Sequence, residues 1–333
     1  MAKNPVRHQG FALLLLLAGA AALPAAAQTT RWTRQFGSAQ MDQANGVAVA
    51  PSGVYVIGTT SPGGQGIPVN SDVIVRKYNF DGLLLWSDQF GTPNTDEGLA
   101  VAANASGVYF AGMIGGTTAQ AEGFLRKYDA SGNLLWTRQF GGANEIVAAK
   151  AVAADSSAVY VAGSATGANS GFLRKYDLNG NLIWEIASSS GSIPGVTGLA
   201  SDGSYLYLSG PPAPLLPGQS EAGTFVRKYD ANGNAVWTRQ FGASSNARVN
   251  AIATDGSNLY MAGTVSGILP GQSGAGGSDA FVRKYDADGN ELWTRQFGSA
   301  SLDEGFGVSA DPTGVYIAGQ AGGTLPGQQS GGG

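Results

Sequence analysis

FLRKYDASGNLLWTRQFG, residues 124–141, is the stretch that decides the fold, because the chain repeats it with few changes. It returns as FVRKYDANGNAVWTRQFG at 225–242 and as FVRKYDADGNELWTRQFG at 281–298. Tryptophans follow one another at intervals of 48 to 56 residues along the chain, at Trp32, Trp86, Trp136, Trp184, Trp237 and Trp293. A period of about fifty residues is typical of blade-like repeats, so an array of similar units is predicted.

Each unit contains four short runs that are typical of β-strands and are separated by turn residues. In the second unit these runs are GLAVAA (98–103), GVYFAG (107–112), GFLRKYD (123–129) and NLLWTRQF (133–140). In the last run Trp136 and Phe140 share one face, while Leu135 and Gln139 share the other. Bulk on both faces is expected of a sheet packed between two other sheets.

The turn between the third and fourth runs has a constant chemistry. A glycine lies four residues after the tyrosine in every copy, where the chain needs a positive φ angle. The aspartate after the tyrosine, as in Asp129, can cap the turn with its side chain, and Asn79 does so in the first unit. The pattern predicts a type I turn closed by a glycine bulge at Gly82, Gly132, Gly180, Gly233 and Gly289.

Four-stranded units repeated radially make a β-propeller, so the predicted fold class is an all-β propeller. Removing 27 of the 333 residues as a signal peptide leaves 306, which gives 51 for each of six repeats. We therefore expect about six four-stranded blades in a single domain over 28–333.

The last blade is expected to be incomplete, because the chain has six tryptophan runs but only five RKY runs. The N-terminal strand at Arg31–Phe36 has no hairpin partner, and we expect it to help close the ring. Two explanations for the missing strand compete, a truncated C-terminus and an imperfect closure by the tail. Truncation is favoured, because an unpaired sheet edge is an association hazard.

Residues 1–27 are predicted to be a secretory signal peptide. Lys3 and Arg7 precede an apolar run from Phe11 to Leu23, and Ala25 and Ala27 supply the small residues of a cleavage site. A retained membrane anchor is the alternative, but the run is short for crossing a bilayer. We expect a secreted or extracytoplasmic protein, in the periplasm or at the cell surface, with no membrane insertion after cleavage.

The repeat resembles the SBBP family, the bacterial "seven-bladed beta-propeller" repeats, from Arg31 to Gln328. The residues that carry the resemblance are a GVAVA-type run, GVYVAG, DAFVRKYDxxGN, LLWTRQFG and an Asp-Glu pair, as seen in 279–303 and 305–319. The chain has six tryptophans where the family name implies seven blades. The resemblance implies a bacterial, extracytoplasmic propeller and assigns it little chemistry.

Composition excludes several kinds of function. The chain has no Cys, and its one His, His8, lies in the signal peptide, so Ser-His-Asp triads, Cys-His pairs and His or thiolate zinc sites are excluded from the mature protein. The net charge is -4 and becomes -6 without Lys3 and Arg7. No basic excess is left to neutralise a phosphate backbone, so nucleic-acid binding is not expected.

Carboxylates are the remaining candidates for chemistry. They recur in the loop between a tryptophan run and the next AVA-type run, at Asp42, Asp96, Glu97, Glu145, Asp303 and Glu304. As a rim around the channel mouth they could hold a cation or a polar ligand. The interpretation that we favour is structural, with these acids paired to the recurring arginines Arg34, Arg138, Arg239 and Arg295, because repetition in nearly every blade is typical of a scaffold.

No cofactor and no metal are expected. Calcium binding is the alternative at Asp286, Asp288 and Asn290, because their spacing resembles the opening of an EF-hand loop. Phe297 stands where that loop needs a glutamate, so turn capping explains these residues better.

Two further features have a structural and a functional interpretation. LPGQ segments at 216–219, 269–272 and 325–328 are interpreted as connections between the second and third strands, and alternatively as mobile loops of a binding face. The tryptophans are interpreted as blade-to-blade core, and alternatively as a stacking platform for sugars or a quinone.

The function predicted from these observations is an exported, non-enzymatic propeller that acts as a binding or surface-interaction scaffold for an unknown protein or glycan. The alternative is a carboxylate-dependent enzyme that acts on extracellular polysaccharide at the channel mouth, with Asp96, Glu97, Asp303 and Glu304 as its acids. A quinoprotein dehydrogenase has little support, because the repeats need no cofactor to pack.

Overall fold

The computed structural model describes residues 31–38, 42–61, 71–117, 119–166, 170–187, 192–311 and 313–328. The predicted signal peptide therefore lies outside the described residues. These ranges contain β-strands and turns but no helix, and so none that is long and apolar enough to cross a membrane.

The strands form five four-stranded sheets and one two-stranded sheet, and in each sheet consecutive strands are neighbours. The first three sheets contain β1 (Asp42–Ala50), β2 (Gly53–Thr60), β3 (Asp72–Tyr78), β4 (Leu84–Phe90), β5 (Thr95–Asn104), β6 (Gly107–Gly116), β7 (Glu122–Tyr128), β8 (Leu134–Phe140), β9 (Val147–Ala154), β10 (Ala158–Ala165), β11 (Ser170–Asp177) and β12 (Leu182–Ile186). The others contain β13 (Gly198–Ser201), β14 (Leu206–Ala213), β15 (Gly223–Tyr229), β16 (Ala235–Gly242), β17 (Arg248–Thr254), β18 (Leu259–Val265), β19 (Asp279–Tyr285), β20 (Glu291–Phe297), β21 (Asp303–Asp311) and β22 (Gly314–Ala321).

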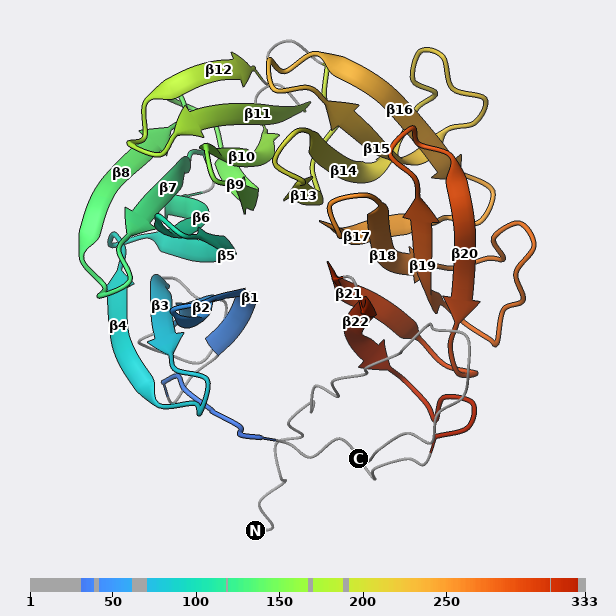
Figure 1. The fold of residues 1–333 in the computed structure, drawn as a ribbon, viewed down its shortest axis with the longest axis horizontal. Coiled ribbons are helices and arrows are strands. Elements are labelled where there is room, and N and C mark those ends of the chain that lie inside the picture. Colours follow the sequence, from blue (N-terminus) through green and yellow to red (C-terminus); the bar gives the residue numbers. More distant parts are fainter. Residues whose placement is uncertain are drawn as a thin grey trace. The chain divides into compact units, whose positions relative to one another are not determined.

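Repeated four-stranded antiparallel meanders are the blades of a propeller. The predicted fold class, an all-β propeller of about six four-stranded blades with an incomplete last blade, is confirmed (Figure 1). The described residues fall into two compact units, one with 31–211 and 226–238 and the other with 212–225 and 239–328. We describe the two units separately.

Successive sheets within a unit pack face to face through apolar side chains. Between the first two sheets, Ile57 and Val75 pack with Phe110 and Phe124 of the next sheet. Val161 and Phe172 of the third sheet pack in the same way against Leu125 of the second. In the other unit, Tyr260 and Val282 pack with Ile317 of the two-stranded sheet. The expectation of packing on both faces is wrong for the fourth strands, because Leu85, Leu135 and Leu292 are about half exposed.

The hairpins between third and fourth strands have the turn that the sequence predicts. Gly132 has φ 92°, its N–H bonds the carbonyl of Asp129 at 3.2 Å, and the Asp129 carboxylate accepts hydrogen bonds from the N–H groups of Ser131 and Asn133. The register shifts at Tyr128, as a bulge requires. The five turn glycines share this backbone, with φ of 78° at Gly82, 92° at Gly132, 81° at Gly180, 84° at Gly233 and 78° at Gly289.

A second constraint acts on four of these glycines, because the tryptophan ring of the preceding repeat lies against each of Gly82, Gly132, Gly180 and Gly233. A Cβ at Gly132 would come within 2.9 Å of the Trp86 ring. The Trp86 indole also stacks on Tyr128 of the next sheet, with 5.8 Å between ring centroids. The six indoles are half-buried. Trp86 therefore lies between two sheets, which is the packing role predicted for the tryptophans.

Gly132→Ala is expected to destabilise the protein more than Gly203→Ala. Both glycines have nearly the same φ, 92° and 89°, but a Cβ at Gly203 would have nothing within 4 Å. Gly203→Ala should therefore cost only the backbone strain, about 1 kcal/mol. Gly132→Ala adds overpacking against Trp86, typically about 1 kcal/mol or more. Urea unfolding of both variants measures the difference, and equal losses would show that the indole exerts no steric constraint.

The N-terminal segment 31–38 was expected to be a strand, but it forms no sheet ladder among the described residues. Its side chains nevertheless contact the first hairpin. They make the same kind of hydrogen bonds that the fourth strands make to the later hairpins. Trp32 Nε1 donates to the carbonyl of Phe80 at 3.0 Å, and Arg34 Nε donates to the carbonyl of Gly82 at 2.7 Å. Side-chain contacts therefore position this segment without strand pairing.

Candidate functional site

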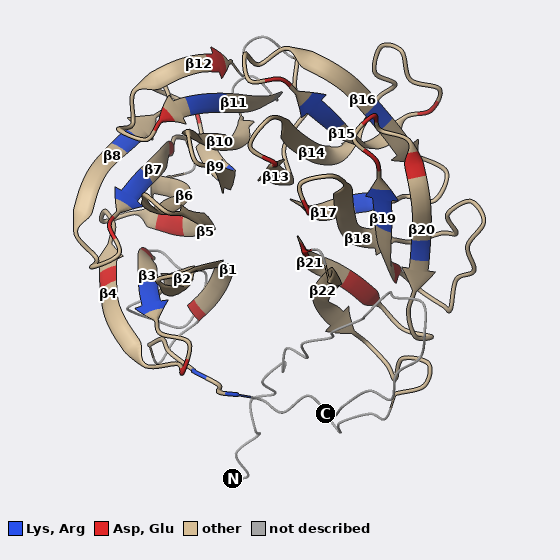
Figure 2. Cartoon of the chain, in the orientation of Figure 1, with Lys and Arg blue, Asp and Glu red and all other residues tan. Residues whose placement is uncertain are grey.

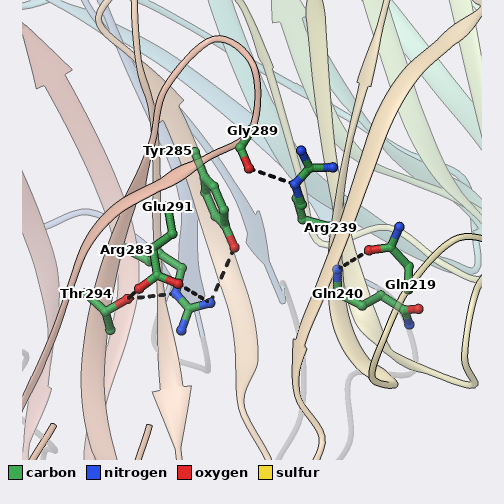
Figure 3. A network of polar contacts seen from close by, with 8 residues as sticks. All are labelled: Gln219, Arg239, Gln240, Arg283, Tyr285, Gly289, Glu291 and Thr294. Atoms are coloured by element: carbon green, nitrogen blue, oxygen red, sulfur yellow. Dashed lines mark hydrogen bonds and ion pairs between the residues drawn. The ribbon is translucent and has the colours of Figure 1, made fainter. Parts of the chain in front are cut away.

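The recurring arginines of the fourth strands bind backbone carbonyls of the next hairpin. Nε of Arg34, Arg138 and Arg239 donates to the carbonyl oxygens of the turn glycines at 2.6–2.7 Å, and Figure 3 shows this contact between Arg239 and Gly289. Among the described residues no ion pair joins Arg34, Arg138 or Arg295 to a loop acid, so the predicted pairing is wrong for these three. A hairpin carbonyl packed against the neighbouring sheet needs a donor, and the guanidinium supplies it.

The arginines of the third strands are also used within the framework. Arg283 is 5% exposed, and it contacts Glu291 at 3.3 Å and donates to Thr294 Oγ1 at 2.8 Å (Figure 3). Its guanidinium lies over the Phe241 ring of the preceding sheet at 3.9 Å. Figure 2 shows Lys and Arg, in blue, on each of the third strands β3, β7, β11, β15 and β19.

The loop aspartates form caps within their own loops. The backbone N–H groups of Ser38, Thr92 and Ser299 donate to the carboxylates of the aspartates four residues later, Asp42, Asp96 and Asp303, at 2.5–2.6 Å. Asp96 and Asp303 are 0% and 1% exposed. The expectation that these two acids line an open rim is therefore wrong, because the loops that they cap bury them.

Glu145 does not take the place of these aspartates. It accepts a hydrogen bond from the N–H of Gly142 at 3.2 Å. In the preceding repeat Asp96 packs against Gly91. The equivalent glycine here, Gly141, is contacted by Val147. The loop after Gly141 is one residue longer than the loop after Gly91, and the sequence comparison missed this insertion.

Each buried aspartate faces a second aspartate that sequence reasoning missed. A Cβ on Gly91 would collide with both Asp72 and Asp96, and one on Gly298 would collide with both Asp279 and Asp303. Asp72 and Asp279 also accept hydrogen bonds at 2.7 Å from Gln89 and Gln296. The sequence did contain a signal for this pair. An aspartate lies four residues before the arginine of the RKY run in the two repeats whose next loop carries Asp96 or Asp303.

Burial raises the pKa of Asp96 above its ordinary value of 3.8, and the Asp72 carboxylate raises it further, while hydrogen bonds from Thr92 and Gly115 oppose the shift. The opposite case is Asp129, whose pKa is lowered by hydrogen bonds from Asn133. The two aspartates should therefore make opposite contributions to the pH dependence of folding.

The wild type should lose stability relative to Asp96→Asn as the pH rises from 3.8 through the raised pKa of Asp96, because folding disfavours its ionised form. Relative to Asp129→Asn, the wild type should lose stability as the pH falls below 3.8, because folding favours ionised Asp129. Urea unfolding between pH 3 and pH 8 measures both differences. Slopes of the same sign for the two variants would contradict this assignment.

The turn at Asp286–Asn290, which resembles an EF-hand opening in sequence, is a turn capped by the Asp286 side chain. The Asp286 carboxylate accepts hydrogen bonds from the N–H groups of Asp288 and Asn290 and from the Asn290 side chain, at 2.8–2.9 Å. These contacts lower the pKa of Asp286. Within the described ranges, no three acidic or histidine side chains are grouped so that they could hold a metal ion.

The LPGQ segments are tight turns, and two of them are tied to the fourth strand. Gly218 has φ 76°, and the N–H of Gln219 bonds the carbonyl of Leu216 at 3.1 Å, as in a type II turn. The Gln219 side chain then accepts from the N–H of Gln240, whose own side chain accepts from the N–H of Leu216 (Figure 3). Gln272 and Gln296 form the same pair of contacts around Leu269.

The first strands contain a feature that sequence reasoning missed, a β-bulge at the same place in five sheets. The ladder skips one residue in each, so that residue has no partner on the second strand. A glycine opposite allows it, since a Cβ at Gly112 would collide with the carbonyl of Glu97. This glycine ends each VYxxG run and was the available signal. The bulge residues are Asn45, Leu99, Lys150, Asn250 and Phe306.

Two clefts lie beside bulge residues, one in each unit. The β5–β9 cleft has a volume of about 430 Å³ and is lined by Glu97, Leu99, Met113, Ile146, Ala148, Lys150, Ser164 and Thr166. The β17–β21 cleft has a volume of about 330 Å³ and is lined by Asn246, Arg248, Asn250, Thr264, Ser266, Ser278 and Glu304.

Four charged side chains line these clefts, two in each. Among the described residues, Glu97, Lys150, Arg248 and Glu304 have no hydrogen bond or ion pair of their side chains. Each cleft thus combines one unpaired acid with one unpaired base. Glu97 and Glu304 are therefore the two predicted acids that the structure places at a cleft.

No family model matches the chain. Residues amounting to 33% of it are 32% identical, over 122 positions, to the "Regulatory protein FlaEY" of Caulobacter vibrioides, and this match spans 13% of that relative's length. Among solved structures, the periplasmic gluconolactonase PpgL of Pseudomonas aeruginosa is 14% identical with a TM-score of 0.49, over 83% of this chain and 78% of that one. The WD40 propeller domain of Doa1 is 13% identical with a TM-score of 0.49, over 85% and 90%.

Proposed function

We propose that this protein is an exported, non-enzymatic propeller that binds a partner, a protein or a glycan, through residues of its first strands. The observation that carries the proposal is that each of the two clefts brings together one acid and one base whose side chains have no partner among the described residues. Within this part of the chain, these four charges make no contact that stabilises the fold. A ligand with complementary groups would give them partners.

Comparison of the repeats with one another supports the same proposal. Lys77, Lys127 and Lys175 make the same contact with a carbonyl of the next hairpin. One position of the first strand varies instead. It is the position that pairs, in the ladder, with the second-strand residue just after the glycine of the VYxxG run. It is occupied by Gln43, Glu97, Ala148, Arg248 and Glu304. Constant framework with varied first strands is what a recognition surface on a fixed scaffold requires.

The alternative of a polysaccharide-cleaving enzyme has less support. Asp96 and Asp303 are buried and accept hydrogen bonds from their own loops, so a polymer cannot reach them without opening of those loops. Glu97 and Glu304 remain accessible, but each lines its own cleft with a base rather than a second acid. A general acid–base pair of carboxylates needs both acids beside one glycosidic bond.

The proposal is tested with a panel of purified bacterial polysaccharides and extracellular proteins as probes. We expect the wild type to bind at least one probe without releasing reducing sugar. A variant with Glu97→Gln, Lys150→Gln, Arg248→Gln and Glu304→Gln should bind at least tenfold more weakly with an unchanged melting temperature.

The matched control is Arg31→Gln, which removes an exposed pair with Asp81 that contributes little to folding. It should bind like the wild type. Hydrolysis of any polysaccharide that is lost in Glu97→Gln or Glu304→Gln would overturn the proposal in favour of the enzyme. Absence of binding to every probe would also overturn it.

A further inference from the structure

The β5–β9 cleft has the chemistry of a site for a peptide side chain. Its lining combines four apolar residues, Leu99, Met113, Ile146 and Ala148, with the charged groups of Glu97 and Lys150. Apolar walls with a few polar groups are the usual composition of a ligand pocket, and about 430 Å³ is within the usual range of volumes. The flexible thioether of methionine also adapts to different apolar groups.

The backbone explains how the two charges come to the same cleft. Glu97 stands opposite Met113 in the β5–β6 ladder, one step from the bulge at Leu99. Lys150 is itself the bulge residue of β9, between Ala149 and Ala151. A bulge re-aims a side chain out of the regular alternation of the strand. The first strands of the second and third sheets, which pack on each other, thus supply one charge each.

Glu97 and Lys150 line the same cleft without forming an ion pair, so the described residues leave both charges available to a ligand. A ligand that satisfies both must carry a cation and an anion on either side of an apolar group. Ser164 and Thr166 also line the cleft and could bond a hydroxyl group, but a neutral saccharide would leave both charges without a counter-charge and would place polar groups against four apolar side chains.

We propose that the β5–β9 cleft binds an extended peptide segment in which one leucine- or phenylalanine-sized side chain lies between a basic and an acidic residue. The apolar side chain packs on Leu99, Met113 and Ile146. The basic group of the peptide contacts Glu97 and its acidic group contacts Lys150. This inference rests on the proposed binding function and specifies its partner as a peptide segment at this site.

The probes are two blocked pentapeptides with the central sequences Lys-Leu-Glu and Glu-Leu-Lys, and versions of both with alanine in place of leucine. Calorimetry or NMR titration of the full protein should detect binding of one order, weakened at least fivefold by the leucine-to-alanine change. Glu97→Gln and Lys150→Gln should each weaken binding at least threefold. Arg31→Gln, which removes only an exposed ion pair with Asp81, should leave it unchanged.

Reversal of both charges, in the double variant Glu97→Lys and Lys150→Glu, should exchange the preference between the two peptide orders. This result depends on direct charge contact, because a merely structural role would not reverse the preference. Failure of both peptides to bind at millimolar concentration, or equal binding of the alanine versions, would overturn the peptide site.

The same experiments separate this proposal from the proposed function. If the panel of polysaccharides and proteins is bound through Glu97 and Lys150 while the peptides fail, the scaffold stands and the peptide class is wrong. If neither the panel nor the peptides bind, both proposals are wrong.

Discussion

The packing of successive sheets depends on one carbonyl oxygen in each of three hairpins, which accepts two hydrogen bonds from the preceding sheet. The carbonyl of Ala130 accepts from Lys77 Nζ at 2.7 Å and from Trp86 Nε1 at 3.3 Å, both in the preceding sheet. Lys77 is 4% exposed and has no carboxylate partner, so the carbonyl dipole and the face of Tyr55 at 5.3 Å must stabilise its charge. Similar pairs of contacts reach the carbonyls of Leu178 and Ala231.

This arrangement separates the residues that dock each hairpin from the residues that line the clefts. The hydrogen bonds that join a sheet to the next hairpin come from third and fourth strands, and they reuse the same residue types in several repeats. The first strands contribute apolar packing on one face, but their bulge residues are not needed for these contacts. Their identity is therefore free to change from asparagine to leucine or lysine without loss of the framework.

The sequence predicted the elements that depend on local chemistry. The hairpin at Asp129–Gly132 follows from residues within five positions of each other, so its turn type was predictable. The partner of Arg138 lies in another hairpin and the companion of Asp96 lies in another strand, about forty and twenty residues away, and no local pattern identifies them. The bulge at Lys150 depends on a glycine of the next strand, Gly163, whose role becomes clear only when the register is known.

The bulge residues also explain why the two clefts differ. Asn250 Nδ2 donates to the carbonyl of Gly305 on the next first strand at 2.9 Å, and Asn45 makes the same bond to Gly98 at 2.8 Å. Leu99 stands at the equivalent position and cannot donate, so no amide bridge of this kind joins β5 to β9. Exchange of one amide for an aliphatic side chain thus removes a polar tie and lines the larger cleft with apolar surface. The chemistry of each cleft is therefore set by single residues that the sheet ladder leaves unpaired.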